Sequence, residues 1–193
     1  MIEKIRESLL ESIEVKRKIL EDEEILKKIL RAAEIISAAL KNNKKLLACG
    51  NGGSAADAQH IVAELVVKYS IERKALPALA LLQDPSTVTA ASNDFGYEHV
   101  FERQVEAHGR EGDVLLAIST SGKSPNVNLA VKKAKQQGLK VIYLTGKDTP
   151  PVADLCDVVI NVPSGETPRI QEVHITIGHI LVYLVEQTLF KER

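Results

Sequence analysis

The sequence predicts an α/β fold in which a five-stranded parallel sheet lies between two layers of helices, as a three-layer sandwich. After residue 45, short apolar runs of strand length alternate with helical stretches. Strand–helix–strand alternation requires crossover connections, which make the sheet parallel and cover both of its faces. The chain has 193 residues, of which 45% are hydrophobic, so it can form the core of about one domain.

The first 42 residues are expected to form a helical hairpin. Apolar residues at three- and four-residue steps predict helices over 2–20 and 22–40, and acidic residues at the start of the second helix suit its dipole. Two apolar stripes need cover, so this hairpin should pack on the domain or on another subunit. A solvated surface pair of helices is the alternative. We expect residues 1–193 to form one domain, with the α/β core over 43–193.

The core is predicted to alternate strands with helices. We expect buried strands at 46–49, 78–82, 114–118, 141–144 and 158–162. We expect helices at 54–69, 84–107 with a break near Gly96, 124–137, briefly around Val152, and 169–190.

Charge and composition exclude several classes of protein. The 25 Lys and Arg residues against 26 Asp and Glu residues leave a net charge of −1, which favours neither nucleic acid nor a membrane as partner. The N-terminal residues lack the apolar stretch of a signal peptide, and no uninterrupted apolar run approaches ~20 residues. We therefore expect a cytoplasmic protein. Cys49 and Cys156 show no paired spacing and are expected to be small core residues.

Two loops at the carboxyl ends of predicted strands have the composition of anion-binding sites, and ligands of open parallel sheets bind at that edge. Residues 50–54, Gly-Asn-Gly-Gly-Ser, let the backbone approach a ligand, and Ser54 can cap the next helix. Residues 119–124, Ser-Thr-Ser-Gly-Lys-Ser, place four hydroxyls at a helix N-terminus. Asn93 and Asp94 are expected at the same edge. Ordinary turn and capping chemistry is the alternative for all three sets.

The glycine loop also imitates a dinucleotide-binding fingerprint through Gly50, Gly52 and Ala55, although this match is weak by itself. A ribose-binding acid is expected about 20 residues beyond such a loop. The acidic residue nearest the end of the second strand is Asp84, 31 positions beyond Gly53. This spacing disfavours a nicotinamide cofactor.

Two predicted helices carry titratable residues whose positions suit metal binding or proton transfer. His60 and Glu64 are one turn apart, so an imidazole and a carboxylate can converge on a metal or on a proton to be moved. A surface pair is the alternative. On the last helix, Gln171, His174 and His179 interrupt an apolar segment. A histidine in such a segment is usually core or capping material, but packing gains nothing from His179 there, so a functional role and a core role are both open.

Four long segments occur in this order: CGNGGSAADAQHIVAEL, ASNDFGYEHVFERQVEAHGREGDVLLAISTSGKSPNV, KVIYLTGKD and TPRIQEVHITIGHILVYLVE. Together they resemble the bacterial phosphoheptose isomerases, a group within the sugar isomerase (SIS) domain family, over nearly the whole chain. The resemblance implies a flavodoxin-like SIS domain. It also implies isomerisation of sedoheptulose 7-phosphate to D-glycero-D-manno-heptose 7-phosphate through an enediol, the first step of ADP-heptose supply for lipopolysaccharide or other surface glycoconjugates.

The resemblance further implies roles for individual residues. Glu64 would be the base that moves a proton between the first two sugar carbons, and His179 its acid/base partner. The implied ligands of one zinc ion per subunit are His60, Glu64, Gln171 and His179. The implied substrate contacts are Asn51, Gly52, Gly53, Ser54, Glu64, Asn93, Asp94, Ser119, Thr120, Ser121, Ser124 and Gln171.

One straight helix does not bring all four implied zinc ligands together. Gln171 and His179 are eight residues apart, which separates them by ~12 Å along the axis and ~80° around it. Both reach one ion only if the helix starts late or bends, or if different subunits contribute. A second departure is Lys68, where we expect the family to carry an Arg. Lysine keeps the charge but loses the bidentate fork, so the role of Lys68 is open.

The resemblance implies a homotetramer with active sites near subunit boundaries. It also leaves an alternative function, because the SIS family includes non-catalytic binding proteins, either associated with a replication initiator or sensing sugar phosphates. The presence of both Glu64 and His179 favours the enzyme.

Overall fold

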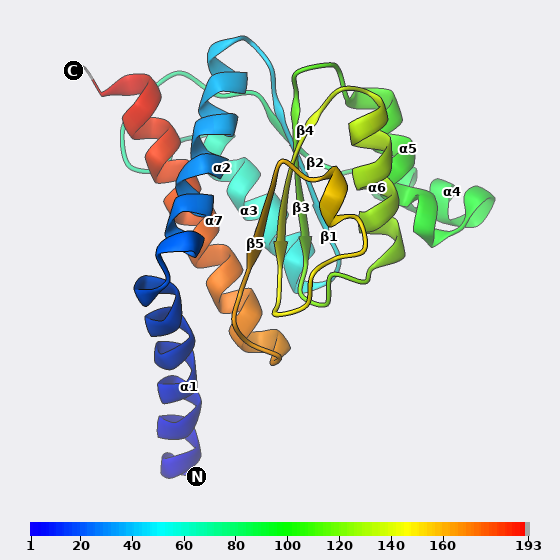
Figure 1. The fold of residues 1–193 in the computed structure, drawn as a ribbon. Coiled ribbons are helices and arrows are strands. Elements are labelled where there is room, and N and C mark those ends of the chain that lie inside the picture. Colours follow the sequence, from blue (N-terminus) through cyan, green and yellow to red (C-terminus); the bar gives the residue numbers. More distant parts are fainter. Residues whose placement is uncertain (192–193) are drawn as a thin grey trace.

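The structure, a computed structural model, describes residues 1–191 (Figure 1). Five strands form one sheet in the order β2-β1-β3-β4-β5, and every neighbouring pair is parallel. The strands are β1 (Leu46–Gly50), β2 (Ala78–Ala80), β3 (Val114–Ser119), β4 (Lys140–Thr145) and β5 (Val158–Asn161). The predicted α/β sandwich is confirmed, and β2 is two residues shorter than expected.

Within residues 1–191, seven α-helices and two 3₁₀ turns precede, connect or follow these strands. They are α1 (Ile2–Glu21), α2 (Glu23–Lys41), α3 (Gly53–Val66), α4 (Pro85–Phe95), η1 (Tyr97–His99), α5 (Val100–His108), α6 (Pro125–Gln136), η2 (Ala153–Leu155) and α7 (Thr167–Phe190). The predicted break near Gly96 is confirmed. Gly96 has a φ of 92°, which favours glycine, and it ends α4 before η1 begins.

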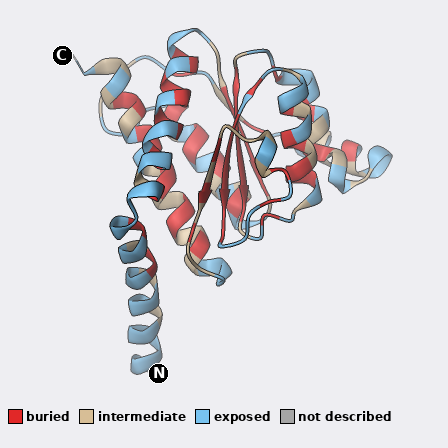
Figure 2. Cartoon of the chain, in the orientation of Figure 1, coloured by how far each residue is buried: buried red, intermediate tan, exposed pale blue. Residues whose placement is uncertain are grey.

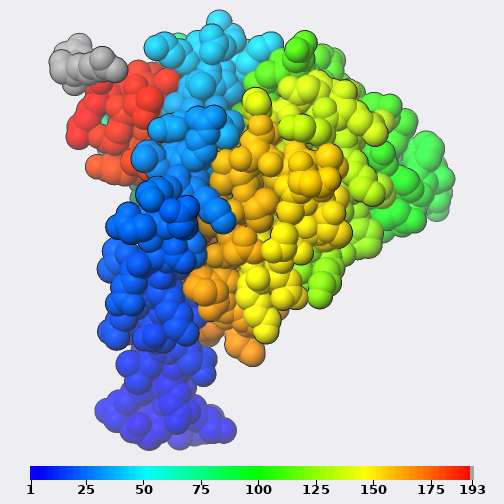
Figure 3. All heavy atoms as spheres, in the orientation of Figure 1, coloured from blue at the N-terminus to red at the C-terminus, as the bar shows by residue number. Residues whose placement is uncertain are grey.

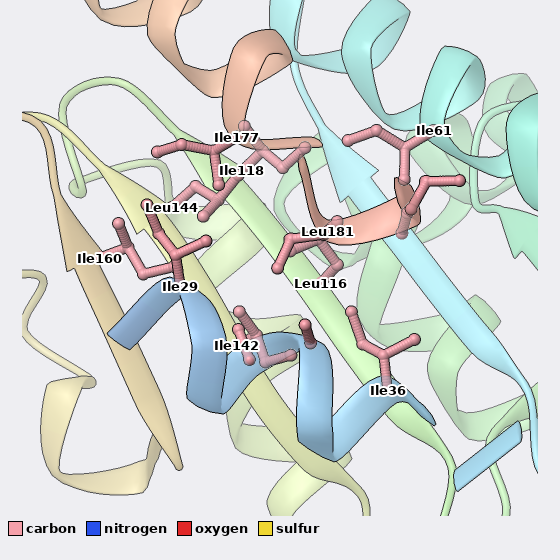
Figure 4. Packing of buried hydrophobic residues seen from close by; sticks show 14 of the residues in the cluster. Ile29, Ile36, Ile61, Leu116, Ile118, Ile142, Leu144, Ile160, Ile177 and Leu181 are labelled. Carbon is pink, nitrogen blue, oxygen red and sulfur yellow. The ribbon is translucent and has the colours of Figure 1, made fainter. Parts of the chain in front are cut away.

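The sheet is buried on both faces (Figure 2). Along β3, Leu116 and Ile118 point into one core, whereas Leu115 and Ala117 point into the other, as the two-residue period of a strand requires. The first core is filled by apolar residues of α2, α3 and α7 (Figure 4). The second is filled by α5 and α6. Because helices cover both faces of the sheet, successive residues of a strand are all buried, and the strand sequences are continuously apolar instead of alternating.

The strand order reverses between β1 and β3, because the chain moves from β1 outward to β2 and then returns to β3 on the other side of β1. Ligands of open α/β sheets bind at such a switch point. The loops that leave β1 and β3 are the two predicted anion-binding loops. The topology therefore places both of them at the same edge of the sheet.

The predicted N-terminal hairpin is wrong in its geometry. Only Asp22 separates α1 from α2, and this residue is the C-cap of α1 and the N-cap of α2. An αα-hairpin needs a loop of about 2–5 residues. The two helices therefore follow one another without folding back, and α1 projects below the body of the molecule (Figures 1 and 3). Val15 and Ile19 near the end of α1 are buried, whereas its first half is largely exposed.

The predicted helix over 54–69 ends early. α3 stops at Val66, and the side chains of Val66 and Tyr69 are exposed. The carbonyl of Leu65 accepts hydrogen bonds from the Arg73 guanidinium and from the amide of Leu76. Partners from the following segment therefore replace the next helical turn.

α7 is long and apolar enough to cross a membrane by length and composition. In this fold it contributes Val173, Ile177 and Leu181 to the core between the sheet and α2 and α3, as a central helix of a globular domain does. The cytoplasmic location stays a prediction.

The two cysteines are free. Cys49 is fully buried, and burial raises the pKa of its thiol to about 12, which agrees with the expected core role. Cys156 is only half-buried, at the edge of the second core.

Candidate active site

The turn after β1 is shaped by its glycines. Gly52 has a φ of 55°, in the left-handed region that favours glycine. A Cβ atom on Gly53 would lie 2.5 Å from Nε2 of Gln171, so α7 packs directly on this turn through the Gln171 side chain. Ser54 is buried and does not cap α3, because Gly52 is the N-cap and no side chain makes a cap hydrogen bond there. The expected capping role of Ser54 is therefore wrong.

The loop after β3 gathers hydroxyl groups at the N-terminus of α6. Ser119 Oγ lies 2.9 Å from Ser124 Oγ and 3.5 Å from Ser121 Oγ. Ser124 is the N-cap of α6 but makes no side-chain cap hydrogen bond. Thr120 and Ser121 line a cavity of about 170 Å³, which also reaches Lys147. Ser121 Oγ accepts a hydrogen bond from the Lys123 amide at 3.1 Å, which is an ordinary turn contact. The hydroxyls of Ser119 and Ser124 contact each other and do not cap the helix, which favours a ligand role for those two.

The two loops are joined by amide hydrogen bonds. The side chains of Asn51 and Asn126 exchange two hydrogen bonds of 2.9 Å, and the Tyr97 hydroxyl donates to Asn51 Oδ1 at 2.9 Å. Sequence patterns did not indicate Asn126 or Tyr97, because neither belongs to a motif with a recognisable spacing. Asn93 and Asp94 are exposed on the last turn of α4, where the Asn93 amide donates to Asp94 Oδ1.

Two helices bring His60, Glu64 and His179 together away from this edge. His60 Nε2 lies 3.2 Å from Glu64 Oε1 and 3.0 Å from His179 Nε2. The three candidate ligand atoms all lie within 4.8 Å of one another. The Tyr69 ring stacks on His179 with a centroid separation of 5.6 Å. We call His60, Glu64 and His179 the histidine–glutamate cluster.

Glycine allows α3 and α7 to approach closely at this cluster. A Cβ atom on Gly178 would lie 2.6 Å from Cδ1 of Ile61, a side chain in the first core. Ile61 follows His60, and Gly178 precedes His179. The close contact therefore sets the separation of the two functional side chains.

The histidine–glutamate cluster fits a divalent metal ion. Two imidazole nitrogens and a carboxylate oxygen are donors that zinc and related metals accept. The separations of 3.0 and 3.2 Å from His60 Nε2 are close to the ~3.3 Å between ligands of a tetrahedral ion with bonds of about 2.0–2.1 Å. We therefore describe these residues as a candidate metal-binding group.

Gln171, the fourth predicted ligand, does not belong to the histidine–glutamate cluster and lies at the glycine loop. Its side chain contacts Gly53, seven residues and ~10 Å before His60 along α3. One chain thus brings together three of the four predicted ligands. The metal role of Gln171 stays a prediction that needs a second subunit.

Asp57 is a further perturbed group beside the cluster, one turn before His60. Its Oδ2 atom is buried and has no hydrogen-bond partner within residues 1–191. Burial raises the pKa of Asp57 to about 6, against the opposing effect of the His60 charge. The three- and four-residue spacing places Asp57 on the same helix face as His60 and Glu64, but it did not indicate a role for this residue.

We call residues 119–124, the loop after β3, the hydroxyl loop. It lies at the carboxyl edge of the sheet, whereas Glu64 of the histidine–glutamate cluster lies near the C-terminal end of α3. Glu64 is eleven residues beyond Gly53, which places it ~16 Å along α3 from the loop edge.

Comparison with known proteins identifies the family. The SIS domain family model matches residues 9–146. The phosphoheptose isomerase of Clostridium acetobutylicum is 52% identical over 189 residues, 98% of this chain and 96% of the relative. The chain belongs to the phosphoheptose isomerases, within the SIS domain family. The resemblance read from the four sequence segments is thus confirmed.

Two further phosphoheptose isomerases agree with this membership. That of a Nitratiruptor species is 59% identical over 150 residues, 78% of this chain and 80% of the relative. The solved structure of the enzyme from Neisseria gonorrhoeae matches with a TM-score of 0.89 at 43% identity, and the match covers 96% of this chain and 98% of that one. The α/β fold is therefore shared with phosphoheptose isomerases along nearly its whole length.

Proposed function

We propose that this protein isomerises sedoheptulose 7-phosphate to D-glycero-D-manno-heptose 7-phosphate. The observation that carries the proposal is the pairing of Glu64 with His179 in a member of the phosphoheptose isomerase family. A non-catalytic binding protein is not favoured, because the full-length relative is named as an isomerase.

Aldose–ketose isomerisation moves one carbon-bound proton and one hydroxyl proton. The Glu64 carboxylate takes a proton from C1 of the ketose while His179 gives a proton to the carbonyl oxygen on C2, which produces an enediol. Glu64 then returns its proton to C2, and His179 takes the hydroxyl proton from the oxygen on C1, which leaves the aldehyde. A positioned acid/base group contributes roughly 10²–10⁴-fold to such a step.

The hydroxyl loop supplies the proposed phosphate site. Ser119, Thr120, Ser121 and Ser124 offer neutral hydroxyl donors at the N-terminus of α6, where the helix dipole favours an anion. Asn51, Gly52, Gly53, Ser54, Asn93, Asp94 and Gln171 are the proposed sugar contacts around the same edge.

We propose zinc as the ion for the histidine–glutamate cluster, with Gln171 of another subunit as a further ligand. When bound, zinc acts as a Lewis acid toward sugar oxygens. Metal analysis of protein purified without chelator tests this proposal. Zinc should co-purify, and stripping it should abolish activity that added zinc restores. Full activity in metal-free protein would contradict an obligatory ion and leave proton transfer as the role of Glu64 and His179.

The active site is proposed to form between subunits of a homotetramer. Glu64 lies ~16 Å along α3 from the glycine loop of its own chain, which supports a site that combines the loops of one subunit with Glu64 of another. α1 offers surface for such an assembly, because Ile5 and Leu9 are exposed on its projecting half.

Product analysis tests the function directly. The purified protein is incubated with sedoheptulose 7-phosphate, and the appearance of the aldose is followed by NMR. We expect conversion to the equilibrium mixture of ketose and aldose. Stable binding of the sugar phosphate without any aldose would favour the sensing alternative, and neither binding nor conversion would reject the substrate.

A further inference from the structure

A buried ion pair joins the segment after α3 to α7. Arg73 Nε lies 3.0 Å from Glu186 Oε1, and the two side chains are 1% and 0% exposed. Removing two charges from water costs about as much as their attraction returns, so stability alone is a weak reason for such a pair. Neither residue belongs to the substrate or metal groups described above.

Glu186 is fully engaged by the segment that follows α3. Its carboxylate accepts hydrogen bonds from the Tyr69 amide at 2.9 Å, the Ser70 amide at 2.9 Å and the Ser70 hydroxyl at 2.7 Å. Burial raises the pKa of Glu186, but these hydrogen bonds and the charge of Arg73 outweigh it and hold the pKa below its usual range. The carboxylate is therefore ionised at neutral pH.

Arg73 is bonded to the end of the helix that carries Glu64. Its Nη2 donates to the carbonyl of Glu64 at 2.8 Å, and its Nη1 donates to the carbonyl of Leu65 at 2.7 Å. The last carbonyls of a helix have no amide partner of their own. The planar guanidinium can serve two of them and Glu186 at once, which a lysine cannot. The backbone position of Glu64 is thus fixed by Arg73.

The same pair reaches His179 along two routes. Glu186 is seven residues after His179 on α7, which places both on nearly the same face two turns apart. Glu186 also holds the amide of Tyr69, whose ring stacks on the His179 imidazole. One ion pair therefore connects the backbone of Glu64, the ring beside His179, and the helix that carries His179.

We propose that Arg73 and Glu186 are positioning residues that hold Glu64 and His179 in the relative placement needed for proton transfer. The proposal rests on the proposed isomerase function. A displacement of ~1 Å caused far from the reacting atoms can lower a rate about 10²-fold. The phosphate-binding loop makes no contact with the pair, so substrate affinity should be little affected.

The test compares Glu186→Gln with a matched control, Asp113→Asn. Gln is nearly isosteric with Glu, but it loses the charge and presents an NH₂ group to donors. Asp113 is likewise buried and ionically paired, with Lys45, and it accepts hydrogen bonds from the amides of Lys45 and Arg110 at the amino end of β3. Both variants remove one buried charge. Only Glu186→Gln changes a residue that contacts Arg73 and the Tyr69 amide beside the histidine–glutamate cluster.

We expect kcat of Glu186→Gln to fall about 10-fold or more with KM within about 2-fold, whereas Asp113→Asn should keep kcat within about 2-fold despite a lower Tm. Zinc affinity, measured by calorimetry, should weaken in Glu186→Gln alone. A kcat and a zinc affinity equal to wild type in Glu186→Gln would overturn the proposal and leave the pair a purely structural role.

Arg73→Lys covers the case in which Glu186→Gln does not fold. Lysine keeps a positive charge opposite Glu186 but cannot reach both carbonyls of α3. A lower kcat with unchanged KM supports positioning, and a wild-type kcat in the folded variant contradicts it. If wild-type protein does not convert sedoheptulose 7-phosphate, the proposed function fails, and zinc affinity alone then decides between positioning and structural roles.

Discussion

Two histidines five residues apart on α7 have opposite environments. His179 is partly exposed and meets His60 and Tyr69, whereas His174 is fully buried with its Nε2 3.1 Å from the carbonyl oxygen of Thr145. A carbonyl oxygen only accepts, so Nε2 of His174 carries a hydrogen and donates a hydrogen bond to it, and the ring is neutral. Burial lowers the pKa of His174 to about 4, although the Thr145 carbonyl opposes this shift.

His174 should make stability depend on pH. The unfolded imidazole binds a proton below its ordinary pKa of 6.5, whereas the folded one does so only near pH 4. The unfolded state therefore gains protons first on acidification, and about 3 kcal/mol of stability present above pH 6.5 is lost by pH 4. We expect His174→Gln, which keeps a donor for Thr145, to lose less stability over this range. Urea unfolding of both proteins at several pH values measures the difference, and parallel curves would contradict the account.

At the scale of single residues, the sequence predicted part of the candidate active site. The spacing of His60 and Glu64 places them one turn apart on any helix, so their pairing needs no tertiary knowledge. The meeting of both with His179 depends on which helices are neighbours, and only the family resemblance indicated it. Arg73 and Glu186 carry no motif and are 113 residues apart, so their contact was not predictable from spacing.

At the scale of elements, the close packing of α3 on α7 determines whether the two functional side chains meet. Gly178 faces Ile61 at this contact, so any larger residue must separate the helices or displace a core side chain.

Gly178→Ala should lower activity more than stability. Alanine gains up to about 1 kcal/mol of helix propensity, which offsets part of an overpacking cost of about 1–3 kcal/mol. The displaced helices leave Glu64 and His179 misplaced, so kcat should fall about 10-fold or more. Thr188→Ala is the control, because it also adds helix propensity to α7 but lies on its exposed surface, ten residues beyond Gly178. Enzyme assays and thermal unfolding measure both quantities. Equal kcat in the two variants would show that this contact does not position the site.

Element boundaries were harder to predict than element types. Periodicity located both N-terminal helices, but it did not give their relative direction, which a single residue between them determines. It also extended α3 beyond Val66, because the side-chain donors that end the helix come from Arg73, outside the periodic segment.

At the scale of the whole molecule, our account places the hydroxyl loop and Glu64 of one active site in different subunits. Spacing along the sequence could not predict this arrangement, because it depends on how the chains assemble. The projecting half of α1 stands clear of the body of the molecule (Figure 3), and its apolar side chains Ile5 and Leu9 are exposed.

Mixed oligomers should therefore recover activity that each parent lacks. Glu64→Gln keeps an intact hydroxyl loop, whereas Ser124→Asp keeps Glu64 but repels the phosphate. Each variant alone should be inactive. When the two chains are co-expressed in one oligomer, some sites combine an intact loop with an intact Glu64, and activity should return. Failure to recover activity in verified mixed oligomers would place the whole site within one subunit.

The central claim is that Glu64 moves the carbon-bound proton of the sugar. Conversion of sedoheptulose 7-phosphate in D₂O, followed by NMR, tests it with wild type and Glu64→Gln, and Glu102→Gln serves as a control at another His–Glu helix pair. We predict deuterium at C2 of the aldose with wild type and the control, and neither product nor exchange with Glu64→Gln. Undiminished product formation by a folded Glu64→Gln variant would contradict the account.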